Sequence, residues 1–151
     1  MIVWCDLPYL KITSDTKPHT CVRQPLPTDT DDEKKDKHKK PFLNKTRIMW
    51  TIEYLGSQYC FVIDKGYTWD GSSCPGMHLL PKLLTASCVH DTLCEDHSKC
   101  GNDRQLSSMV FREIGIESGV NKIFMHIAYN AVDNYQKIFG KDKNGKKWGK
   151  K

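Results

Sequence analysis

The spacing of apolar residues changes near Gly76, between the two halves of the chain. Before this point, residues 46–55 place apolar side chains at every second position, which is typical of a strand with one buried face. After it, apolar residues recur at intervals of three and four, as on one face of a helix. Because strands come first and helices follow, the sequence predicts an α+β fold, with a small antiparallel β-sheet packed against three C-terminal helices.

The strongest strand prediction is a hairpin over residues 46–63, with its turn at Gly56-Ser57-Gln58. Shorter extended segments are expected within residues 1–13, at 21–23 and at 67–69. Before the last of these segments, Asp64-Lys65-Gly66 has the composition of a turn. The sheet is therefore expected to come entirely from the first half of the chain.

Three helices are expected in the second half. Pro81 suits the first turn of a helix that ends near residue 97. Asn102 followed by Gln105 resembles a capping box, which begins a second helix that ends at Gly115. A third helix is expected over residues 119–139. Its predicted core stripe consists of seven residues: Val120, Ile123, Phe124, Ile127, Ala131, Tyr135 and Ile138.

The length of 151 residues suits one domain, which we expect to cover residues 1–140. Residues 28–40 hold five acids, five lysines and no apolar side chain, so we expect them to form a mobile loop. Residues 141–151 carry six lysines and one aspartate, which equals the net charge of +5. They are expected to form a disordered basic tail that contacts nucleic acid or acidic surfaces weakly.

Two features bear on where the protein is found. No apolar run approaches the roughly 20 residues of a membrane span, and residues 1–6 lack the pattern of a signal peptide. The seven cysteines are odd in number, and without an export signal we expect reduced thiols. We therefore expect the protein in a cytoplasm or inside a virion.

A pair of titratable residues, His90 and Asp91, lies in the middle of the first, largely apolar helix. Such groups are rarely buried unless they are paired or used. His90 is a candidate general base, and Asp91 suits a cation because neighbouring helical side chains diverge. The acid that orients His90 is expected from another element. Asp103 and Asp70 are the candidates for this role, and Asp133 is the reserve.

Other interpretations of these residues stay open. His90 and Asp91 can equally be a buried polar pair that joins the helix to the sheet. Ser72 and Ser73 are weak candidates for a nucleophile, since Asp70-Gly71-Ser72-Ser73 also reads as a turn. Two metal sites are further alternatives: a partial zinc site at Cys94-x-x-His97-x-x-Cys100, and a metal phosphohydrolase site of His78, His90, Asp91 and Asp133.

Several segments follow one another in a characteristic order and spacing. They are Gly66-Tyr67-Thr68-Trp69-Asp70-Gly71-Ser72-Ser73-Cys74-Pro75, His90-Asp91-Thr92-Leu93-Cys94, Asp103-Arg104-Gln105-Leu106, Gly115, Ala131-Val132 and Phe139-Gly140. Together they resemble the DUF1353 family, a family of unknown function common in tailed phages and prophages. Cys94 and Asn102 stand where the family has Tyr and Ala. The resemblance covers about residues 46–140 and implies a phage or prophage protein of the host cytoplasm or virion, with other virion proteins as partners.

A second resemblance concerns mechanism. Cys88-Val89-His90-Asp91-Thr92-Leu93-Cys94 resembles the active-site helix of phospholipases A2. It implies that His90 activates water and that Asp103 orients His90. It also implies that Asp91 binds calcium, the one candidate cofactor, with Asp70 in the turn that replaces the calcium loop of those enzymes.

The sequence therefore leaves two alternative predictions of function, from different classes. The first is a hydrolase-like protein that acts on an ester or lipid through His90, with calcium as its cofactor. The second is a non-enzymatic virion or accessory protein in which the His-Asp and Asp-Gly-Ser motifs are architectural. The metal phosphohydrolase is a third, less favoured function.

Overall fold

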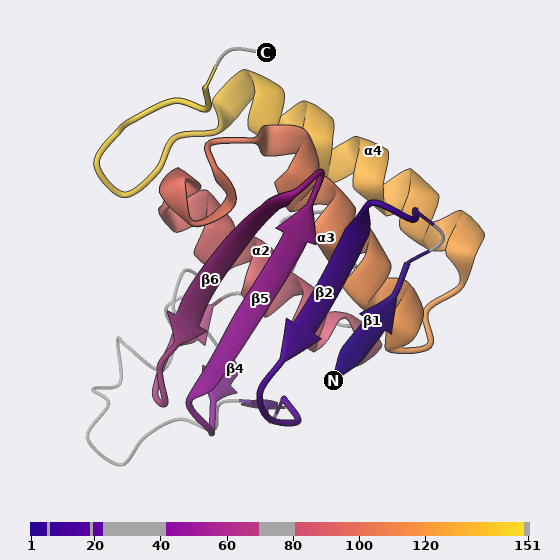
Figure 1. The fold of residues 1–151 in the computed structure, drawn as a ribbon. Coiled ribbons are helices and arrows are strands. Elements are labelled where there is room, and N and C mark those ends of the chain that lie inside the picture. The colour runs from indigo at the N-terminus through magenta and orange to yellow at the C-terminus, as the bar shows by residue number, and fades with distance from the viewer. Residues whose placement is uncertain (6, 19, 23–41, 70–80, 150–151) are drawn as a thin grey trace.

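A computed structural model describes residues 1–5, 7–18, 20–22, 42–69 and 81–149, and within them it confirms the α+β fold (Figure 1). Four strands form an antiparallel sheet in the order β1-β2-β5-β6, and the helices lie together behind one face of it. The strands of this sheet are β1 (Ile2–Trp4), β2 (Leu10–Ser14), β5 (Ile48–Tyr54) and β6 (Ser57–Ile63).

The predicted hairpin is the centre of the sheet. β5 and β6 pair from Ile48 opposite Ile63 to Tyr54 opposite Ser57. The turn falls at Leu55 and Gly56, one residue earlier than expected. Both residues have positive φ (49° and 82°), as a two-residue hairpin turn requires. The alternation in β5 buries one side of the strand against the helices, which is what its sequence predicts.

A second, smaller sheet lies at one end of the first. Its order is β3-β4-β7, with β3 (Thr20–Val22), β4 (Phe42–Asn44) and β7 (Thr68–Trp69). Asn44 joins the two sheets, because its side-chain amide donates hydrogen bonds to the backbone oxygens of Ile63 and Asp64. β7 brings Trp69 into the core, where its side chain is fully buried.

Three α-helices follow in the described residues: α2 (Leu84–Glu95), α3 (Arg104–Glu117) and α4 (Lys122–Phe139). A short 3-10 helix, η2 (Pro81–Leu83), precedes α2, and a second one, η3 (His97–Cys100), lies between α2 and α3. α3 packs against both α2 and α4, so it is the middle helix of the layer. Gly115 of α3 allows the close approach of α4, since a Cβ atom there would lie 2.6 Å from the sulfur of Met125.

The predicted core stripe of α4 is wrong at five of its seven positions, because only Val120 and Phe124 of the stripe are partly buried against the core. The fully buried residues of this helix are Met125, Ala128 and Val132, whereas Ile123 and Ile127 are 74% and 64% exposed. The cause is the position of the helix at the outside of the layer, where α3 is its principal neighbour. Its apolar residues cover more of the circumference than one neighbour can bury, and packing against α3 selects a different face.

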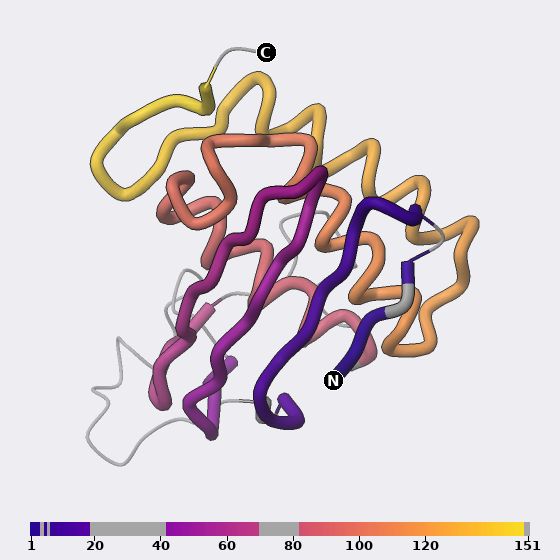
Figure 2. The backbone as a smooth tube through the Cα atoms, in the orientation of Figure 1, coloured from indigo at the N-terminus to yellow at the C-terminus, as the bar shows by residue number. Residues whose placement is uncertain are grey.

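Residues 141–149, expected to belong to a disordered tail, form a defined turn after α4 (Figure 2). A bridge between Lys141 and Lys147 closes the turn. Asp142 accepts hydrogen bonds from the backbone amides of Asn144 and Lys146, which stabilises the tight backbone path. The segment thus packs back onto the helices although it is rich in lysine.

Candidate functional site

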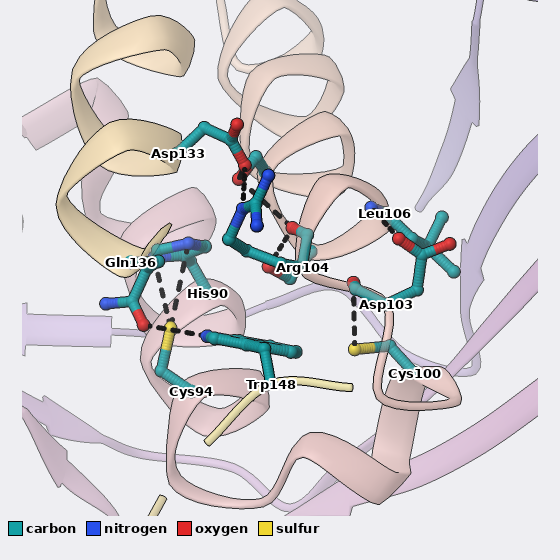
Figure 3. A network of polar contacts seen from close by, with 11 residues as sticks. His90, Cys94, Cys100, Asp103, Arg104, Leu106, Asp133, Gln136 and Trp148 are labelled. Carbon is teal, nitrogen blue, oxygen red and sulfur yellow. Dashed lines mark hydrogen bonds and ion pairs between the residues drawn. The ribbon is translucent and has the colours of Figure 1, made fainter. Parts of the chain in front are cut away.

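His90 lies on the side of α2 that faces α3, and its side chain is almost fully buried. Its imidazole packs against the ring of Phe111, with ring centroids 5.3 Å apart. One turn further along α2, the Cys94 sulfur lies 3.7 and 3.8 Å from the two ring nitrogens (Figure 3). The surroundings of this candidate base are therefore an aromatic ring and a thiol.

Burial determines the charge of His90. It lowers the pKa of the imidazole to about 4, and the negative charge of Asp133 opposes this effect only in part. The ring is therefore neutral at physiological pH. A general base works best with a pKa close to the pH at which it operates, so this environment makes His90 a weak base.

Asp133 of α4, the reserve candidate, is the carboxylate whose charge acts on His90. It is held in place by α3. Arg104 Nε donates to it at 3.1 Å, and Ser108 Oγ donates to the same oxygen at 2.9 Å. The hydrogen bonds of Asp133 thus go to Arg104 and Ser108 of α3, and only its charge acts on His90.

Asp103, the preferred candidate, occupies the N-cap of α3. Its carboxylate accepts a hydrogen bond from the backbone amide of Leu106 at 3.1 Å, which is the usual N-cap contact. In Figure 3 its side chain points toward Leu106 and away from His90. Asn102, the predicted cap, instead adopts a positive φ of 59° in the preceding turn. Asp70, the other candidate, lies outside the described residues, as do Ser72, Ser73 and His78.

Asp91 is half-buried and accepts a hydrogen bond from the phenol of Tyr67 at 3.0 Å. Burial, together with the Asp91 charge, raises the pKa of Tyr67, so the phenol stays protonated and remains a donor. A second contact runs parallel to this one, because Trp69 Nε1 donates to Ser87 Oγ at 3.0 Å. These two bonds join α2 to the segment that contains β7.

The metal sites expected from the sequence are not assembled by the described residues. Among them, no group of three or more His, Cys, Asp or Glu side chains could hold a metal ion. Calcium takes six to eight oxygen ligands, and Asp91 is the one predicted ligand that the structure places. The described chain therefore contains one of the two predicted calcium ligands, since Asp70 lies outside the described residues.

The Cys94-His97-Cys100 set does not converge either. Cys100 Sγ points to the backbone oxygens of His97 and Asp103, at 3.6 and 3.7 Å. Burial raises the pKa of Cys100 to about 12 and that of Cys94 well above its usual value. Both thiols are therefore protonated at physiological pH.

Sequence reasoning missed two partners of the site. In the sequence, Tyr67 and Arg104 appear only as members of an expected element or of the family motif. An Arg at the first turn of one helix and an Asp on the next are a signal for an ion pair. The signal becomes specific only when the packing of α3 against α4 is known.

These observations define a small α+β domain in which polar side chains join α2 to the segment of β7 and α3 to α4. The chain matches the sequence profile described as "Protein of unknown function (DUF1353)" over residues 46–132, more than half of its length, and it belongs to that family. The matched region begins just before β5 and ends within α4. No curated protein and no solved structure matches the chain. None of the described helices has the length and apolar character needed to cross a membrane.

Proposed function

We propose that the chain is a phage- or prophage-type accessory or structural protein without catalytic activity, in which the His90-Asp91 pair joins α2 to its neighbours. The observation that carries this proposal is that the two side chains contact different parts of the fold. His90 packs against Phe111 of α3, while Asp91 accepts the hydrogen bond of Tyr67 beside β7.

The acidic residues around the pair support the same function. Asp103 caps α3 through the Leu106 amide, and Asp133 is bound to Arg104. Each acid therefore has a structural partner, and each partner joins or begins a helix. A buried polar group is tolerated when its hydrogen bonds are satisfied in this way. The phage or prophage setting rests on the resemblance of residues 46–140 to the family pattern.

A metal-independent hydrolase is the second candidate, and one observation favours it. His90 is neutral at physiological pH, and the negative charge of Asp133 raises its pKa in part. A neutral imidazole can accept a proton from water, but with a pKa of about 4 it does so as a weak base. In this function an ester or lipid would be the substrate.

The two functions differ in what His90→Gln changes. The full chain and this variant are assayed on short-chain nitrophenyl esters and on phospholipid vesicles, with calcium and with a chelator. His126→Gln, on the exposed side of α4, is the matched control. We expect no hydrolysis above the buffer rate by any of the three proteins, and a changed stability for His90→Gln alone. Hydrolysis by the parent that His90→Gln abolishes, while circular dichroism shows an intact fold, would favour the hydrolase.

A further inference from the structure

The outer face of α4 carries an uninterrupted apolar row. Its members follow each other at intervals of four residues, so they form one ridge along the helix. Ile123, Ile127, Tyr135 and Phe139 are 74%, 64%, 49% and 64% exposed, and Ile138 beside them is 70% exposed. Ala131, at the centre of the row, is exposed as well.

The middle of this face also lacks charge, and the exposed residues Lys122 and Lys137 lie near its two ends. Between Ile123 and Tyr135 the exposed positions are filled by apolar residues and by His126, Asn130 and Asn134, without any Asp, Glu, Lys or Arg. The whole chain, by contrast, is 27% charged. Membrane-surface helices and nucleic-acid interfaces both need Lys or Arg around their contact area. The composition of the middle of this face therefore favours an uncharged protein surface as its partner.

The spacing of the row suits a second copy of the same helix. When ridges of this kind interdigitate, two helices cross at about −50° with their axes 8–10 Å apart. A crossing at Ala131 places the smallest side chain at the point of closest approach. A two-fold axis there brings Tyr135 against the partner's Ile127 and Phe139 toward the partner's Ile123. The same patch then fits itself, as a two-fold interface requires.

The exposed apolar area of this face is close to what such an interface buries. At about 200 Å² for a fully exposed large side chain, the exposed fractions of the row together with Ile138 leave roughly 600 Å² of apolar surface uncovered. This is the upper end for the largest apolar patch of a monomer, and a standard interface buries about 800 Å² on each partner. The remaining area of about 200 Å² on each partner would come from the uncharged polar residues beside the row, His126, Asn130 and Asn134.

We propose that α4 is a symmetric dimer interface, in which the row Ile123, Ile127, Ala131, Tyr135 and Phe139 packs against the same row of a second copy of this chain. The proposal goes beyond the function proposed for the His90 site and does not depend on it. The inner face of α4 remains packed on α3 in both the monomer and the dimer.

The test is the mass of the full chain in solution, measured by sedimentation equilibrium over a wide concentration range. We expect a dimer of 17.4 kDa chains for the parent. Ala131→Glu should give a monomer, because two carboxylates would meet at the axis, and Glu is a good helix former in the exposed position. Ile127→Lys, which places charge one turn from the axis, should do the same.

Leu55→Asp is the matched control. Leu55 is 64% exposed in the hairpin turn and has a positive φ that Asp tolerates. This variant should remain dimeric. A parent that is monomeric at the highest concentration overturns the proposal. So does dimerisation that persists in both α4 variants while circular dichroism shows them to be folded, because the copies would then associate through another surface.

Discussion

The imidazole of His97 lies flat against the indole of Trp148, with ring centroids 3.6 Å apart and planes 10° apart. His97 is fully buried by this contact and its surroundings, while the Trp148 Nε1 group donates to Gln136 of α4 at 3.1 Å. The backbone amide of Lys143 donates to the backbone carbonyl oxygen of Glu95, at the end of α2. The residues after α4 therefore connect the ends of two helices.

Removing the Trp148 indole should raise the pKa of His97. Burial lowers this pKa in the folded chain, and the Asp142 charge opposes the effect only in part. Trp148→Ala exposes the ring to water, so we expect the pKa to rise toward 6.5 and the free energy of unfolding to fall by about 2 kcal/mol. Histidine titration by NMR measures the first and urea unfolding the second. Trp148→Phe, which keeps an aromatic face, is the control. An unchanged His97 titration in Trp148→Ala would contradict this account.

The depressed pKa of His90 should make stability depend on pH. The folded value is about 4 and the unfolded value about 6.5, so between them the unfolded chain binds more protons. The free energy of unfolding therefore rises with pH in this window. It is expected to lose about 3 kcal/mol as pH falls from above 6.5 to 4. Urea unfolding of the parent and of His90→Gln at several pH values checks this. A loss of equal size in both proteins would assign the effect to other groups.

The order of strands and helices could be predicted because it depends on local periodicity. The hairpin of β5 and β6 and the three helices each repeat their pattern over enough residues to identify the element. Which face of α4 is buried could not be predicted, because Ile127 and Ala128 are adjacent and only the position of α3 decides between them. The site shows the same limit. The sequence predicts that His90 and Asp91 lie on a largely apolar helix. That Asp103 caps α3, and that the charge of Asp133 acts on His90, depends on how the helices pack.

The hydrogen bond between Tyr67 and Asp91 should stabilise the fold independently of any chemistry at His90. Tyr67→Phe removes the donor and leaves a half-buried carboxylate without it, which should lower the free energy of unfolding by about 2 kcal/mol. Asp91→Asn should have a smaller effect, since the amide oxygen still accepts. The double variant tests whether the two effects are coupled, and we expect less than the sum of the single changes. Additive effects would show that the two side chains act separately.

The N-terminus of α3 offers a test of what Asp103 does. If the carboxylate serves as the N-cap through the Leu106 amide, Asp103→Ala should lower the free energy of unfolding by about 1 kcal/mol. Asp103→Asn should change it by a few tenths of that, because Asn caps a helix as well as Asp does. Gln105→Ala is the matched control, since Gln105 is exposed in the same turn and would matter only if Asn102 were the cap. Urea unfolding of the three variants separates these cases. A loss in Asp103→Asn as large as that in Asp103→Ala would mean that the negative charge of Asp103, and not its capping oxygen, is what the fold requires.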